Sequence, residues 1–277
     1  MPFGPIDLFW IGLVPCTAAA LAMWVCGRFP VRATAAWSVS IAGGLVVGMV
    51  AQNARVGWPT ALGKLLHPRV AIDWLPWLVL VAALISVLAA YAPRSWQRWL
   101  VALACVFAIA TPLRLLASNA SAMTRWSAGE KLGILAFWSL AFAAWWFTLA
   151  LGRLNRQPLV RSGLLLAVTL GISLTIAASG SITLGELGGV AAAALLGAIG
   201  SAIVLNQLAA GPSDAAGPLA IMLGGLILVG YFHAELSATN AALLAISLSA
   251  AAGWLPFPLP LPPGEGRGEG SLAVGWG

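Results

Sequence analysis

Apolar residues form nine long runs along the chain, separated by short connections that hold most of the charged residues. Runs such as 132–151 and 190–210 are apolar on every face, whereas the strands of a membrane barrel alternate apolar and polar positions. Because about 20 apolar residues of helix cross a bilayer core about 30 Å thick, each run predicts a membrane span. The predicted spans are residues 6–26, 34–52, 74–91, 96–116, 131–151, 163–178, 187–210, 216–232 and 239–257.

The composition supports a membrane protein and excludes an ordinary soluble domain. Hydrophobic residues make up 61% of the 277 positions and charged residues 8%, against roughly 25% charged residues in soluble domains. Inside a bilayer every peptide group must find its partner within its own segment, which favours helices. We therefore predict an all-α polytopic transmembrane helix bundle with short loops. It has eight or nine transmembrane helices, because the flanks of the ninth run lack charge.

The predicted membrane domain, residues 1–257, has two chemically different parts. Residues 1–161 hold thirteen of the fourteen Lys and Arg residues, whereas residues 162–257 hold none. Residues 258–277 are rich in Pro and Gly, which exclude a regular helix, so we expect a disordered tail there. Residues 262–270 resemble the translation of a GC-rich intergenic repeat of bacterial genomes, which implies that this tail is not a functional element.

Small residues recur every four positions in the sixth and seventh spans. The stripes are Ala167, Gly171, Thr175 and Ser179, and Gly189, Ala193, Gly197 and Ser201. Such stripes let another helix backbone approach closely and let hydroxyl groups bond across the contact. We expect these two helices to pack on each other or on the eighth span, and the stripes to offer a contact to a membrane-protein partner. Gly43, Gly44 and Gly48 of the second span predict close helix contact in the same way.

The positions of the basic residues predict the orientation of the chain. The net charge of +6 would suggest nucleic acid in a soluble protein, but here the basic residues lie between apolar spans. We therefore expect the lipid bilayer, and no nucleic acid, as their partner. Short connections on one side hold Arg28, Arg32, Arg94, Arg98, Arg153, Arg156 and Arg161. The positive-inside rule places that side in the cytoplasm and the N terminus outside. We expect the membrane to be the inner (plasma) membrane of a bacterial cell.

Several polar residues have the spacing of helix caps. Ser127 with Glu130, and Thr183 with Glu186, match the capping box in which a hydroxyl and a carboxylate bond free amides at a helix start. Asp214 precedes the eighth span and predicts an N-cap. The longest polar connection, 53–73, contains a stretch at 60–66 that predicts a short surface helix between two prolines.

The predicted outer face collects the ionisable residues that could do chemistry. They are His67, His233, Asp73, Glu130, Glu186 and Glu235. His233 with Glu235, together with Glu186 and Asp73, are the candidate catalytic residues, as acid, base, proton relay or ligands of a divalent cation. The alternative is that Glu186 is a cap, that His67 and Asp73 are solvated loop residues, and that His233 and Glu235 lie in the wet interface.

No motif selects a reaction. The sequence lacks the phosphate loop, the dinucleotide fingerprint and the HExxH and GxSxG motifs, and its three cysteines have no metal-ligand spacing, so we expect no cofactor and no metal site. Two function classes stay open. The first is a transport-type or structural membrane component. The alternative is a membrane-embedded enzyme that acts on lipid or polyprenyl substrates at the outer face.

Overall fold

The computed structural model describes residues 9–55, 57–117, 127–151, 158–206, 215–233 and 236–251, and nearly all of them are helical. The elements are η1 (Phe9–Leu13), α2 (Val14–Arg28), α3 (Ala33–Ala54), α4 (Trp58–Leu66), α5 (Ala71–Tyr91), α6 (Arg94–Ala117), α8 (Ala128–Leu151), α9 (Pro158–Ala178), α10 (Ile182–Val204), α11 (Ala216–His233) and α12 (Ala238–Ala251). Within these residues, seven helices are long and apolar enough to cross a membrane, and α9 and α12 contain shorter apolar helices. This confirms the predicted all-α, multi-pass membrane fold.

The predicted spans match the observed helices closely, except that the sixth and the seventh begin earlier than predicted. The sixth span is predicted over 163–178, but α9 begins at Pro158. The sequence predicts the seventh span over 187–210, but α10 begins at Ile182. Helix α10 starts earlier because Gly185 and Glu186 contact neighbouring helices, as described below. They can therefore lie inside the helix. The short surface helix is confirmed as α4. Asp214, Glu235 and the tail at 258–277 lie outside the described residues.

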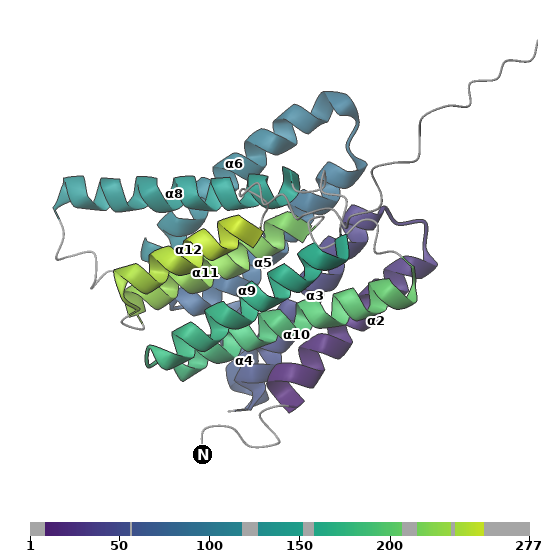
Figure 1. Cartoon of the computed structure of the whole chain (residues 1–277), viewed down its shortest axis with the longest axis horizontal. Helices are drawn as coiled ribbons and strands as arrows, with labels where there is room; N and C mark the ends of the chain where they lie inside the picture. Colours follow the sequence, from purple (N-terminus) through teal and green to yellow (C-terminus); the bar gives the residue numbers. More distant parts are fainter. Residues whose placement is uncertain are drawn as a thin grey trace, which may run out of the picture.

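Helix α11 lies at the centre of the bundle (Figure 1). Every residue from Ala216 to Gly230 is buried. Its glycines allow large neighbours to approach, since a Cβ at Gly224 would lie 2.9 Å from the Trp145 ring and one at Gly225 would lie 2.6 Å from Leu75. The arginine-free part of the chain therefore supplies the central packing element.

Helices α2, α3 and α10 form a second tightly packed unit. A Cβ at Gly44 of α3 would lie 2.7 Å from Ala19 and 2.9 Å from Ala194, and one at Gly48 would lie 2.5 Å from Val190. Small residues thus let three backbones approach one another, as membrane helices commonly do. The predicted contact role of the α3 glycines is confirmed.

The two small-residue stripes have different neighbours in the structure. The stripe on α10 packs along α2, where a Cβ at Gly197 would clash with the Cys16 carbonyl group and Ser201 donates to the Ala20 carbonyl at 3.3 Å. Helices α9 and α10 do pack on each other, as predicted, but through Ser173 and Ala177 of α9 and not through its stripe. In the described part of the chain, no atom lies close to a Cβ built at Gly171. A partner contact through the α9 stripe stays a prediction.

Of the two predicted capping boxes, one is confirmed and one is wrong. At the start of α8, the Ser127 amide donates to Glu130 at 2.8 Å and the Glu130 amide donates to the Ser127 hydroxyl at 3.3 Å. At the start of α10, however, the N-cap is Ser181, whose hydroxyl accepts from the Leu184 amide. The helix begins two residues before the predicted cap would allow, so Thr183 lies inside α10 and Glu186 takes another role.

Replacing Ser181 by alanine is expected to lower the free energy of unfolding by about 1 kcal/mol, because the first turn of α10 loses its side-chain acceptor. Thr183→Ala is the matched control, since Thr183 is an internal residue of the same first turns. Thermal unfolding of both variants in a mild detergent measures the difference. A larger loss of stability in Thr183→Ala than in Ser181→Ala would mean that Thr183 is the N-cap, as the sequence predicts.

Candidate functional site

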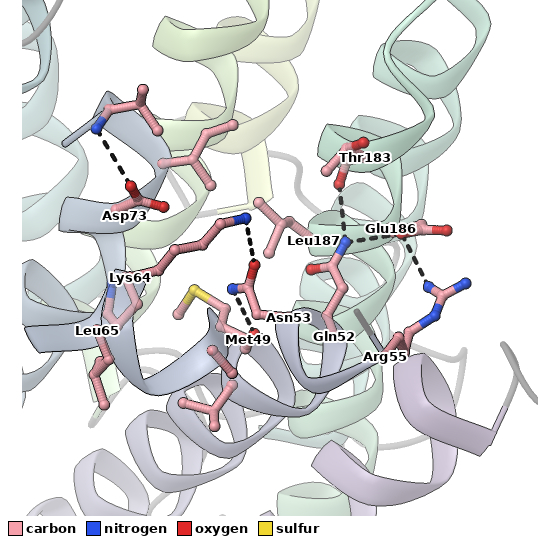
Figure 2. A pocket seen from close by; sticks show the side chains of 15 residues that line it. Met49, Gln52, Asn53, Arg55, Lys64, Leu65, Asp73, Thr183, Glu186 and Leu187 are labelled. Carbon is pink, nitrogen blue, oxygen red and sulfur yellow. Dashed lines mark hydrogen bonds and ion pairs between the residues drawn. The ribbon is translucent and has the colours of Figure 1, made fainter. Parts of the chain in front are cut away.

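A cavity of about 570 Å³ lies at one end of the bundle, where α3 ends and where α5 and α10 begin. Helix α4 forms its remaining wall (Figure 2). The polar residues that line it are Gln52, Asn53, Arg55, Lys64, Asp73, Thr183 and Glu186. Its volume falls in the usual range for small-molecule sites, roughly 300–1,000 Å³. Charged side chains from four separate helices or their ends therefore meet in one hollow of an otherwise apolar protein.

Glu186 is the centre of the polar network in this cavity. Its carboxylate accepts a hydrogen bond from the Gln52 side-chain amide at 2.8 Å and forms an ion pair with the Arg55 guanidinium at 3.2 Å. Gln52 also donates to the Thr183 carbonyl at 3.3 Å. Gln52 and Arg55 lie three residues apart, so they project from the same side of the end of α3. The network joins α3 to α10 and explains why Glu186 does not cap its own helix.

Lys64 brings α4 into the network. Its ammonium group donates to the Asn53 side-chain oxygen at 3.0 Å, and Figure 2 shows the side chain reaching across the cavity from α4 to α3. The Asn53 amide in turn donates to the Met49 carbonyl at 3.0 Å. The last turn of α4 has a second attachment, because the Trp77 indole donates to the Leu65 carbonyl at 2.7 Å. Two polar contacts therefore hold α4 over the cavity.

Asp73 lines the same cavity but serves first as a helix cap. It lies in the first turn of α5, and its carboxylate accepts from the Arg69 and Val70 amides at 3.2 and 3.3 Å. A carboxylate at a helix N-terminus is favoured by the free amides and by the helix dipole. The interpretation of Asp73 as a solvated loop residue is therefore wrong, since it belongs to α5 and is only partly exposed.

The predicted site residues are only partly brought together. Glu186 and Asp73 line one cavity, whereas His233 is an exposed residue at the end of α11 and does not line it. His67 ends α4 and is exposed. Glu235 lies outside the described residues. Among the described residues, no group of three or more His, Cys, Asp or Glu could hold a metal ion.

Of the polar residues that line the site, Thr183 is predicted only as a cap, and the sequence candidates do not include Gln52, Asn53, Arg55 and Lys64. Their sequence signal is a cluster of amide and basic side chains at the end of an apolar span, followed by a short amphipathic helix. Such a cluster looks like an ordinary membrane boundary, because basic residues commonly flank spans. Arg114, whose place near a span end predicts extension into the headgroups, stacks on the Trp74 ring at 3.7 Å while remaining exposed.

Comparison with known proteins adds no relative to these observations. No family model, no curated protein and no solved structure matches the chain.

Proposed function

We propose that the protein is a transport-type component of the membrane, a permease, and that the cavity bounded by α3, α4, α5 and α10 is its substrate site. The observation that carries this proposal is the polar network of Glu186, Gln52, Arg55 and Lys64 at the end of an apolar bundle. Ionisable residues are costly beside lipid, and in membrane proteins they commonly mark substrate pathways. The cavity also has the size and the mixed polar and apolar lining of a small-molecule site.

The arrangement of the helices supplies a second argument for transport. The network ties α3 to α10, and the same two helices pack against α2 through Gly44, Gly48 and Gly197. Small residues let these helices approach closely, so their contact depends on backbone packing and on the hydrogen bonds between them. A substrate that competed for Arg55 or Gln52 would loosen the contact between α3 and α10 at the cavity end. The unit is therefore suited to couple occupation of the cavity to helix movement.

Cysteine accessibility tests this proposal whatever the substrate is. In a variant whose three native cysteines are replaced by serine, Thr183→Cys probes the cavity and Ala202→Cys probes the opposite end of α10, where the residue is fully buried. For a permease we expect Thr183→Cys to react with a membrane-impermeant maleimide from one side of sealed vesicles. Ala202→Cys should react more slowly, and from the other side. Alternating exposure of the two ends is the defining behaviour of a transporter.

The control for this experiment is Ala220→Cys in the fully buried centre of α11, which should stay unreactive as long as the protein is folded. If Ala202→Cys behaves like this control under all conditions while Thr183→Cys reacts, the cavity is static and the permease proposal fails.

An enzyme acting on lipid or polyprenyl substrates is the second candidate function, because Glu186 and Asp73 line the same cavity. Both carboxylates already accept hydrogen bonds, Glu186 from Gln52 and Arg55 and Asp73 from backbone amides, which suits a fixed acceptor better than a general base. A Glu186→Gln variant that retained binding but changed the cellular lipid profile would favour the enzyme. The His233 and Glu235 hypothesis fails if His233→Ala and Glu235→Ala leave that profile unchanged.

A further inference from the structure

Helix α4 presents two different faces. Ala61, Lys64 and Leu65, at the spacing of one helix face, line the cavity. Trp58, Leu62 and Leu66, four residues apart, form a second stripe and are 57%, 50% and 65% exposed. A stripe of large apolar side chains with a Trp at its end is typical of a helix that lies in the membrane interface with that face in lipid. At nine residues α4 is too short to cross a bilayer, so we place it in the interface.

This position makes α4 the partition between the cavity and the surrounding lipid. Lys64 and Leu65 close the inner side, and Leu62 and Leu66 face outward. The helix is preceded by Gly57, whose φ of 138° is a conformation open mainly to glycine. The chain can therefore enter α4 at a sharp angle from the end of α3, which brings the helix over the cavity.

Among the described residues that line the cavity, one cation has no acidic partner. Arg55 pairs with Glu186, and one oxygen of the Asp73 carboxylate accepts from the two amides at the start of α5. Lys64, by contrast, donates to the neutral Asn53 oxygen. An ammonium group has three donors, so it can bind an anion while keeping this hydrogen bond. Lys64 therefore has donors left to bind an anionic group.

The rest of the cavity wall is apolar. It is formed by Met49, Leu65, Val70, Ile72 and Leu187, among others. A free inorganic anion has no apolar surface to bury against such a wall. The glycerol and upper acyl groups of a lipid would bury apolar surface there, with a gain in free energy of about 25 cal/mol per Å². The Lys64 ammonium group and the apolar lining together match a molecule with an anionic head and an apolar body.

We propose that this cavity binds a phosphate-type anion at Lys64 and that the anion is the headgroup of a lipid-like molecule, which enters from the bilayer past α4. The inference rests on the proposed function, since it names the substrate class of the same site. The shared chemistry of lipid and soluble candidates is the phosphate ester, and the apolar wall and the lipid-facing stripe of α4 favour the lipid.

Native mass spectrometry of the full chain in mild detergent tests the proposal, with phosphatidylglycerol, phosphatidylcholine and glycerol phosphate as probes. We expect phosphatidylglycerol to bind more tightly than the other two, and Lys64→Gln to lower its affinity by about tenfold, the effect of one charge-assisted hydrogen bond. Lys64→Arg should retain most of the affinity. Lys131→Gln is the matched control, because it removes one positive charge at the start of α8, outside the cavity lining.

Two results would overturn the proposal. Equal loss of phosphatidylglycerol affinity in the Lys64 and Lys131 variants would show a general surface attraction and no site. Lys64-dependent binding of glycerol phosphate as tight as that of the lipid would show a site for soluble anions, not for lipid. Melting without ligand shows whether Lys64→Gln is folded, and the comparison of the three probes on the wild-type chain tests the proposal if it is not. A static cavity in the accessibility experiment would remove the permease proposal but leave this lipid site standing.

Discussion

Replacing Gly197 by alanine is expected to destabilise the folded protein by about 1–3 kcal/mol, whereas the same substitution at Gly200 of the same helix is expected to stabilise it slightly. A Cβ at Gly197 would clash with the Cys16 carbonyl group and lie 3.0 Å from the Cys16 Cα, so the α2 backbone itself must move. Overpacking of that kind costs about 1–3 kcal/mol. At Gly200, no described atom lies within 4 Å of the added Cβ, and alanine is the better helix former by about 0.5–1 kcal/mol.

The two glycine variants form a matched pair, because the substitution, the helix and the detergent are the same and only the neighbour differs. Unfolding in mixed micelles with increasing dodecyl sulfate measures both free energies. Similar values for the two variants would mean that α2 and α10 do not approach as closely as the structure has them, and the packing of the α2, α3 and α10 unit would have to be revised.

Glu186→Ala and Arg55→Ala are each expected to lower the free energy of unfolding by about 1–3 kcal/mol. Each removes one half of the ion pair between two partly buried side chains, since the Arg55 and Glu186 side chains are 24% and 11% exposed. The Arg55→Ala/Glu186→Ala double variant should be more stable than the sum of the two losses predicts. We expect a coupling free energy of about 1 kcal/mol, because the contact between Arg55 and Glu186 is lost in each single variant and cannot be lost twice.

Equilibrium unfolding of the wild type, the two single variants and the double variant completes this cycle. Lys131→Ala combined with Glu186→Ala is the control, and its effects should add, because Lys131 lies at the start of α8, outside the cavity. Additive effects for Arg55 and Glu186 would mean that the 3.2 Å ion pair contributes nothing to the contact between α3 and α10. The central role assigned to Glu186 would then be wrong.

Part of the candidate site is visible in the sequence. Glu186 and Asp73 stand out because isolated acids beside apolar runs are unusual, and the short helix at 60–66 follows from its flanking prolines. The partners of Glu186 cannot be found in this way. Arg55 and Glu186 are 131 positions apart in the chain, and no local pattern indicates which of several membrane-boundary arginines meets which acid. That choice depends on which helices become neighbours.

Local signals determined what depends on local forces. The length and hydropathy of the apolar runs determined the helical membrane class, because unpaired peptide groups are too costly in lipid. The spacing of Ser127 and Glu130 determined the start of α8, since both partners lie within one turn. Glycines in α3 indicated close contact, although not with which helix.

Only the tertiary structure decided which face of each helix is buried and what it touches. Helices such as α9 and α10 are apolar almost all round, so periodicity singles out no buried face, and a stripe of small residues is equally possible on the lipid side. On α10 the stripe packs against α2, whereas on α9 the contact with α10 uses Ser173 and Ala177 and the stripe through Gly171 is left outside that contact. The same packing brought Gln52 and Arg55 to Glu186 and Lys64 to the same cavity, because helix neighbours in a membrane are chosen by shape and hydrogen bonding between distant segments, which no single stretch of sequence contains.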